Sequence, residues 1–380
     1  MIRRVFRVLT VILLAALLLK GCLVKDVPES DVKPSEDKNI SSDWTYPTPK
    51  NVTINGVDYL QSQAPIGNFG GELITSTIGE GPKTFNPFNC KDNTSQVMAS
   101  IMYDGLLTTD PIYGETIPKL AKSYSISPDG KTYTIKLRHG VKWSDGKPIT
   151  ANDVVFTWRD IIFAGFGDTS TRDSLVIDDK LPQVRKIDDY TVEFTTHKPY
   201  APFIRLLSAS IAPKHIFMPA VKKGKEYFDS FLSTNTPPKD FVTSGAFKLK
   251  EYVPAQRVVF ERNPNYYEIN KKDQKLPYLD KYIFLIVGDL NNEVLKFEAK
   301  ELDVISLQGS KVARYKSLEP HSDFKLYNLG PTTSTTYLSM NLNNRKNKDG
   351  KFYVNPVKQK WFQDINFRHA VDYAIDRKNM

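Results

Sequence analysis

An Asp-Gly turn between two alternating segments constrains the fold of this chain more than any other feature. Asp129-Gly130 separates residues 123–126 from residues 133–137, where apolar side chains alternate with Thr and Lys. Glycine tolerates the positive φ that a tight hairpin turn needs, and alternation with a period of two is typical of a half-buried strand. We therefore predict a β-hairpin over residues 123–137.

A helix is predicted shortly after a second turn, Asp145-Gly146. Thr150 and Asp153 have the spacing of a capping box in which a carboxylate replaces the usual Glu. The apolar residues that follow have the spacing i, i+4, i+7 and i+8 of one helix face: Val154, Trp158, Ile161 and Ile162. Another alternating segment, 191–194, predicts a further strand. Strands and helices mixed in this way indicate an α/β class with mixed sheets.

Residues before this region predict a strand and a helix, preceded by a polar tether. Residues 70–74 are typical of a short strand, and Ser95 is expected to open a helix with Val97, Met98 and Ile101 on one face. Residues 22–68 are rich in Asp, Lys, Ser and Pro, so we expect a polar tether there. A chain of 380 residues exceeds the size of one hydrophobic core and predicts two or three domains.

The N-terminus has the pattern of an export signal. Arg3, Arg4 and Arg7 precede an apolar run over residues 8–19, which is too short for a comfortable bilayer span. The run ends in Leu19-Lys20-Gly21-Cys22, which resembles the bacterial lipoprotein cleavage box except for Lys20. We expect residues 1–21 to be removed and Cys22 to carry lipid that holds the protein on a membrane. A signal-anchor with an incidental cysteine is the alternative.

Composition and motifs argue against several other classes. With 40% hydrophobic and 25% charged residues, the chain is neither disordered nor a multi-span membrane protein. Its basic clusters, at 345–360 and 271–275, lie among polar residues and indicate solvated loops, so no nucleic acid is expected. No GxSxG, HExxH, Walker or CxxC motif is present, and the five histidines lack ligand spacing, so neither a metal nor another cofactor is expected.

Ordered blocks between Gly70 and Met380 resemble one known family. The densest block runs from Ile117 to Val154 and contains both Asp-Gly turns. Three shorter blocks follow in the family's order: Thr243–Leu249 with Glu261–Tyr267, Leu279–Lys281 with Leu302–Val304, and Phe362–Ala370 with Ala374–Arg377. The combination resembles the extracellular solute-binding proteins of the peptide/nickel type, family 5, which supply oligopeptide and dipeptide ABC importers.

The resemblance implies an α/β fold like that of type II periplasmic binding proteins, with two lobes and an extra inserted domain. The expected domains are the signal peptide 1–21, the tether 22–68, domain I over 69–95 and 199–328, inserted domain II over 96–198, and the start of domain III over 329–380. Residues 336–341 read as a strand of domain III. Because relatives continue well beyond the position of Met380, most of the second lobe is expected to be missing.

The implied function is binding by hinge closure, not catalysis. Such a protein captures oligopeptides or dipeptides in the periplasm or at the cell surface and passes them to the permease subunits of an ABC importer. In relatives, the ligand faces two segments, which correspond here to Lys91, Asp92 and Asn93, and to Thr243, Ser244, Gly245 and Ala246. Gly245 would permit close backbone approach. Alternatively, the first segment is a solvated turn with Asn93 and Thr94 capping the next helix.

Other ligands and outcomes remain open from the sequence. The family also includes nickel-chelate and oligosaccharide binders, an inactive fragment is a further alternative, and a surface hydrolase is the least favoured. The charged residues that anchor peptide termini in relatives belong to the part expected to be missing. Residues 22–380 are therefore predicted to bind a mixed tripeptide library weakly or not at all, and low-micromolar binding by calorimetry would contradict this.

Overall fold

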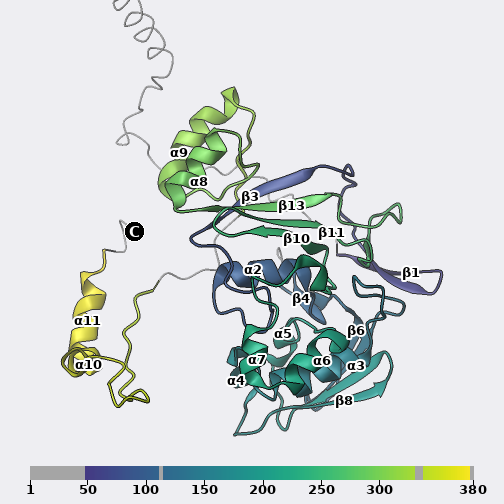
Figure 1. The fold of residues 1–380 in the computed structure, drawn as a ribbon, viewed down its shortest axis with the longest axis horizontal. Coiled ribbons are helices and arrows are strands. Elements are labelled where there is room, and N and C mark those ends of the chain that lie inside the picture. Colours follow the sequence, from purple (N-terminus) through teal and green to yellow (C-terminus); the bar gives the residue numbers. More distant parts are fainter. Residues whose placement is uncertain (1–47, 111–113, 330–336, 377–380) are drawn as a thin grey trace, which may run out of the picture. The chain divides into compact units, whose positions relative to one another are not determined.

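A computed structural model describes residues 48–110, 114–329 and 337–376 (Figure 1). Contacts divide the chain into one unit, Ser41–Val312, and a second unit composed of Met1–Ile40 and Ala313–Met380. The predicted signal peptide and Cys22 lie outside the described residues. Among the residues that are described, none of the helices has the length and apolar character needed to cross a membrane.

A mixed four-stranded sheet forms one layer of the large unit, in the order β10-β11-β13-β3 (Figure 1). Its strands are β3 (Glu72–Ile78), β10 (Phe247–Val253), β11 (Arg257–Arg262) and β13 (Lys281–Val287). β3 pairs in parallel with β13, from Glu72 opposite Lys281 to Ile78 opposite Val287, and the other pairs are antiparallel. The strand predicted at 70–74 is confirmed, beginning at Glu72, and its partner lies about 200 residues further along the chain.

An antiparallel four-stranded sheet, in the order β6-β7-β9-β8, forms a second layer. Its strands are β6 (Ala121–Ile126), β7 (Thr132–Leu137), β8 (Gln183–Asp188) and β9 (Thr191–Thr195). The predicted hairpin is β6-β7: Gly130 has φ +69° and its N–H donates to the Ser127 carbonyl at 2.8 Å. The predicted hairpin and the strand at 191–194 are both confirmed, and so is the mixed α/β class.

The capping box at Thr150 is confirmed. The Asn152 N–H donates to Thr150 Oγ1 at 3.3 Å, and the Thr150 N–H donates to Asp153 Oδ2 at 2.9 Å. Helix α3 (Ala151–Phe156) begins there and continues as a π-helix, η3 (Thr157–Ile162). All four residues of the predicted apolar face are buried: Val154, Trp158, Ile161 and Ile162.

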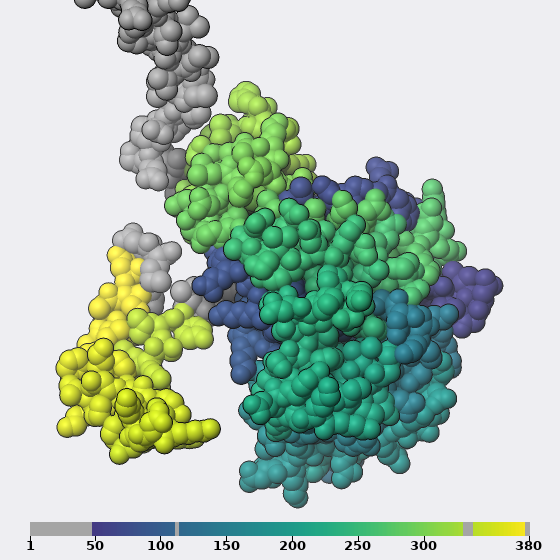
Figure 2. Space-filling view, in the orientation of Figure 1, coloured from purple at the N-terminus to yellow at the C-terminus, as the bar shows by residue number. Residues whose placement is uncertain are grey.

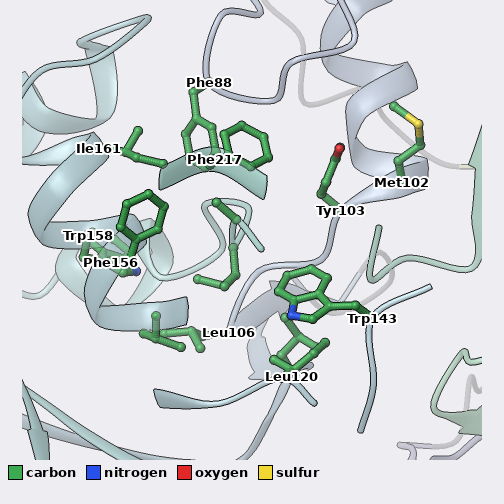
Figure 3. Close-up of a cluster of buried hydrophobic side chains, with 14 of the residues drawn as sticks. Phe88, Met102, Tyr103, Leu106, Leu120, Trp143, Phe156, Trp158, Ile161 and Phe217 are labelled. Atoms are coloured by element: carbon green, nitrogen blue, oxygen red, sulfur yellow. The ribbon is translucent and has the colours of Figure 1, made fainter. Parts of the chain in front are cut away.

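Short elements complete the large unit. The helices are α2 (Asn93–Met102), α4 (Ser170–Leu175), α5 (Phe203–Leu206), α6 (Lys214–Lys222), α7 (Lys225–Ser230), the 3-10 turn η4 (Pro238–Asp240) and α8 (Leu290–Glu298). The two-stranded ladder is β4 (Leu107–Thr109) with β5 (Thr116–Pro118). They surround one hydrophobic cluster that includes Phe260 and Phe284 of the first sheet, Ile135 and Phe194 of the second, and the residues in Figure 3. The space-filling view shows the described residues of the large unit as one continuous body (Figure 2).

A hairpin replaces part of the predicted tether. β1 (Lys50–Ile54) and β2 (Val57–Gln61) pair antiparallel, and β2 pairs in parallel with β12 (Glu268–Ile269). The turn is Asn55-Gly56, with φ +50° and +79°, which is the commonest two-residue hairpin sequence. Asp58 and Leu60 are buried. The prediction of a tether over 22–68 is therefore wrong for residues 50–61, while 22–47 lie outside the described residues.

The described part of the second unit consists of short helices joined by irregular segments. Helix α9 (Gly309–Leu318) crosses the boundary between the units and leads into the 3-10 turn η5 (Glu319–His321). Helices α10 (Pro356–Gln363) and α11 (Ile365–Ala374) are capped by Asn355 and Asp364. The strand predicted at 336–341 is absent from residues 337–341, and Thr336 is not described. An extended segment becomes a strand only when a partner satisfies its backbone groups, and no described segment pairs with 337–341.

Candidate functional site

The first predicted segment, Lys91–Asn93, forms the start of helix α2. Asp92 is the N-cap: Oδ1 accepts from the Ser95 N–H at 2.8 Å, and Oδ2 accepts from Ser95 Oγ at 2.7 Å. Lys91 and Asn93 are exposed. The helix therefore begins at Asn93 and not at Ser95, and Asp92, not Asn93 or Thr94, is its cap. Both carboxylate oxygens of Asp92 accept hydrogen bonds within the cap, so the main role of this side chain is to stabilise the start of the helix.

The second predicted segment, Thr243–Ala246, lies behind the other end of α2. The N–H groups of Ser244 and Gly245 both donate to the Met102 carbonyl, at 3.1 and 2.7 Å. A Cβ on Gly245 would lie 2.4 Å from the Ile101 carbonyl oxygen, so the close approach predicted at Gly245 involves the backbone of α2. The side chains of Thr243 and Ser244 are buried. Geometry thus gives this segment a positioning role, and direct ligand contact stays a prediction.

A hollow of about 420 Å³ runs along the face of α2 between these two ends. Gln96, Ala99, Ser100 and Tyr103 line it from the helix, with the i, i+3, i+4 and i+7 spacing of one face. The facing walls come from residues 166–171 and 208–210. Polar groups and small side chains therefore line much of a concave surface, which is the usual form of a small-ligand site.

Two loops are joined at the N-terminal end of the hollow. The Asp168 N–H donates to the Phe88 carbonyl at 2.7 Å, which brings the residue 88–91 loop beside residues 166–171. Hydrogen bonds from Ser170 and the charge of Lys91 lower the pKa of Asp168. Burial raises the pKa of Cys90 to about 12, so its thiol stays protonated at neutral pH and is a poor nucleophile. The loop before the predicted segment thus lines the hollow through Cys90, and Lys91 is close enough to act on the charge of Asp168.

A buried set of charged and phenolic groups lies at the other end of the hollow. Asp104 and Lys119 both line the hollow there. Lys119 Nζ donates to Tyr266 Oη at 2.8 Å and to Glu268 Oε1, and Tyr267 Oη donates to Asp104 Oδ2 at 2.8 Å. The Asp104 N–H donates to Ser244 Oγ at 2.9 Å, so the predicted Ser244 positions this group from behind. We call Asp104, Lys119, Tyr266, Tyr267 and Glu268 the floor cluster.

Burial and neighbouring charges shift the pKa values of the floor cluster. Burial raises the pKa of Asp104 to about 6, against the opposing attraction of Lys119. Burial alone would lower the pKa of Lys119, but the charges of Glu268 and Asp104 outweigh it and raise that pKa. Burial also keeps Tyr266 and Tyr267 protonated by raising their pKa values. Lys119 and Glu268 thus form a charged pair beside Asp104, whose negative charge is only weakly balanced by a nearby positive charge.

The hollow contains hydrogen-bonding groups and charge, and the protonated Cys90 is its one thiol among the described residues. Throughout the described ranges, no three His, Cys, Asp or Glu residues are grouped in a way that could hold a metal ion. The chemistry that these residues support is reversible binding of a polar or charged ligand.

Comparisons with known proteins define the class of protein to which this fold and hollow belong. The family model for bacterial extracellular solute-binding proteins, family 5 middle, matches residues 115–380. A probable ABC transporter-binding protein of Deinococcus radiodurans is 31% identical over 78% of this chain and 50% of its own length. The fold is therefore that of a solute-binding protein, and the chain belongs to the bacterial extracellular solute-binding proteins of family 5.

Solved structures support the same assignment. The ABC transporter substrate-binding protein CtaP of Listeria monocytogenes is 33% identical, with a TM-score of 0.54 over 66% of this chain and 47% of its own. The oligopeptide-binding protein AppA of Bacillus subtilis, solved with a nonapeptide, is 29% identical, with a TM-score of 0.54 over 66% and 46%. This chain spans about half the length of the relatives that it matches.

Proposed function

We propose that this chain is one lobe of the substrate-binding protein of an ABC importer, and that the whole protein captures oligopeptides or dipeptides outside the cytoplasmic membrane. Family membership supports the class, and the nonapeptide bound to the similar AppA supports the ligand. The observation that carries the proposal is the hollow along α2. It offers hydroxyl, amide and charged groups to a peptide main chain and leaves room for bridging water.

The proposed mechanism is hinge closure of two lobes around the peptide. We propose domain I over 69–95 and 199–328, inserted domain II over 96–198, and the start of domain III over 329–380. Two features support the first two: β3 pairs with β13 across the intervening sequence, and the second sheet is built entirely from residues 121–195. Peptide would bind to the lobe that carries the hollow and shift the equilibrium toward the closed form.

Peptide capture is tested by equilibrium dialysis of the chain against a mixed tripeptide library at millimolar concentration. Retained peptides are measured by mass spectrometry, with serum albumin as control. We expect weak retention and recovery of the peptides intact. Cleaved peptides would indicate a hydrolase. Parallel dialyses against an oligosaccharide such as stachyose and against a nickel chelate test the alternatives, and retention of either one without peptides would assign the hollow to that ligand instead.

Lipid anchoring at Cys22 is the second part of the proposal. The export-signal pattern before Cys22 supports it, because a diacylated cysteine would hold the protein on the outer face of a membrane. Radiolabelled palmitate fed to cells that express the chain should label the wild type and not Cys22→Ser. Cys90→Ser is the matched control and should be labelled like the wild type. Equal labelling of wild type and Cys22→Ser would contradict the anchor.

A further inference from the structure

The two carboxylate oxygens of Asp104 have different surroundings. Oδ2 accepts a hydrogen bond from Tyr267 Oη at 2.8 Å. Oδ1 lies 4.0 Å from Lys119 Nζ, which is beyond hydrogen-bonding distance, and no other described group donates to it. Asp104 lines the hollow, and its side chain retains 11% of its accessible surface. One oxygen of a mostly buried carboxylate is therefore available to a donor that enters the hollow.

The charges around Asp104 leave it short of positive partners. Lys119, from the end of β5, is the nearest cation, but its ammonium already donates to Glu268 and Tyr266. Arg138, the residue after β7, lies over the Tyr267 ring, 5.8 Å from its centroid, and donates to Lys119, Asn51 and Tyr59 oxygens. Asp104 and Glu268 thus share one close ammonium, and burial makes an uncompensated carboxylate costly.

A second buried polar group in the same hollow has no partner. Tyr103 is the residue before Asp104, and only 2% of it is exposed. Its hydroxyl makes no hydrogen bond within the described part of the chain, although Tyr103 lines the hollow. A buried hydroxyl left without a partner costs free energy. Of these two neighbouring residues, Asp104 thus presents an accepting oxygen to the hollow, whereas the Tyr103 hydroxyl oxygen has almost no accessible surface and interacts with the Cys90 thiol.

We propose that the floor of the hollow is a subsite for a cationic group of the ligand, an ammonium or guanidinium that binds Asp104 Oδ1. The inference rests on the proposed peptide-binding function and gives it a specificity: peptides that carry a Lys or Arg side chain are preferred. Lys119 and Glu268, paired with each other, position the subsite and do not bind the ligand's charge. The small side chain of Ala99 leaves room for an aliphatic stem, whereas the Ser208 backbone already fills the space beside Gly105.

Matched tripeptides test the subsite in the full 380-residue chain. N-acetylated Ala-Lys-Ala and N-acetylated Ala-norleucine-Ala are titrated by NMR at pH 7.5, so that only the side-chain charge differs. A charge-assisted hydrogen bond predicts about tenfold tighter binding of the lysyl peptide. Peptides with a free N-terminus, titrated in parallel, show whether the terminal amine can occupy the subsite instead. Equal affinities of the two acetylated peptides would overturn the proposal without affecting peptide capture.

Two variants localise the effect. Asp104→Asn keeps an acceptor for Tyr267 and removes the charge, so the ratio of lysyl to norleucyl affinity should fall to about one. Asp168→Asn, at the other end of the same hollow, is the control and should keep the preference. Loss of the preference in Asp168→Asn alone would overturn the assignment. The wild-type comparison decides the question even if Asp104→Asn fails to fold.

The pH dependence gives an independent check. Because burial raises the pKa of Asp104 to about 6, its carboxylate is protonated at pH 5 and the preference for the lysyl peptide should fall there relative to pH 7.5. If no peptide binds at any pH, the proposal of peptide capture is wrong, and the subsite is then tested with n-butylammonium. An Asp104-dependent rise in melting temperature with n-butylammonium, absent with n-butanol, would support the subsite, and no such rise would overturn it.

Discussion

Asp58 shows how one residue connects the β1-β2 hairpin to the rest of the large unit. Its carboxylate accepts from Thr53 Oγ1 at 2.6 Å, Lys122 Nζ at 2.9 Å and the His139 N–H at 3.0 Å. Burial alone would raise the pKa of Asp58, but these donors outweigh burial and lower it from 3.8 to about 2. A folded-state pKa below the unfolded value means that Asp58 stabilises the fold above pH 4 and that this contribution disappears as the pH falls toward 2.

The substitution Asp58→Asn should therefore destabilise the fold in a pH-dependent way. We expect the free energy of unfolding to fall by about 2 kcal/mol at pH 7, from the size of the pKa shift. The difference from the wild type should shrink steadily between pH 4 and pH 2. Urea unfolding at each pH measures it, with the exposed Glu80→Gln as a control that should match the wild type. A difference that stays constant with pH would contradict the electrostatic explanation.

Gly245 is predicted to be required for packing against α2. In Gly245→Ala the new Cβ would meet the backbone of Ile101 and Met102 at 2.4 to 2.9 Å, and backbone atoms cannot move aside cheaply. We expect a loss of about 2 kcal/mol in the free energy of unfolding, as for overpacked cores. Gly288→Ala is the matched control, because the nearest atom would be 3.7 Å away. Equal stability of the two variants would refute the close approach.

Local residue patterns were predictable, and contacts between distant residues were not. The Thr150 cap and the Asp129-Gly130 turn depend on neighbours within a few positions, so their sequence spacing predicts their geometry. The floor cluster has no such pattern, because Lys119 and Glu268 are 149 positions apart. Only the fold brings them together. Thr243 and Ser244 came from the family resemblance, which indicates a position near the cleft but does not say which way a side chain points.

At the scale of elements, the hairpin over 50–61 was missed for a physical reason. Its buried face consists of Asp58 and Leu60, so the alternation places a carboxylate where an apolar residue is expected. That carboxylate is tolerated because three donors satisfy it. The Asn55-Gly56 turn was the available signal. The prediction of a tether rested on composition alone, because residues 22–68 are rich in polar residues, and it was therefore incorrect for 50–61.

Helices α10 and α11 should be much less stable than the sheets. Among the described residues, α11 has no buried side chain and α10 has one, Gln359, while Trp361 and Tyr373 are exposed. Helices of this length are marginal without packing. Hydrogen exchange should therefore be fast in 356–374 and slow in β7, whose Ile135 is fully buried. Comparable protection of α11 and β7 would contradict this.

At the scale of the large unit, one core joins two sheets that the sequence assigns to different domains. Phe260 and Phe284 of the first sheet and Phe194 of the second belong to the same hydrophobic cluster. Alternation predicts which residues of a strand face a core, but it does not say whether two sheets share that core. The mixed α/β class was thus predictable, whereas the shared core and the hollow between α2 and its neighbours required the structure.

The central claim is that the hollow along α2 receives a peptide, and site-directed photocrosslinking tests it most directly. A tripeptide that carries a diazirine side chain is irradiated with the chain at millimolar concentration, and the modified residues are mapped by mass spectrometry. We predict crosslinks within 88–108, 166–171 and 208–210, suppressed by excess unlabelled tripeptide. Crosslinks confined to other segments, or unaffected by the competitor, would contradict the claim.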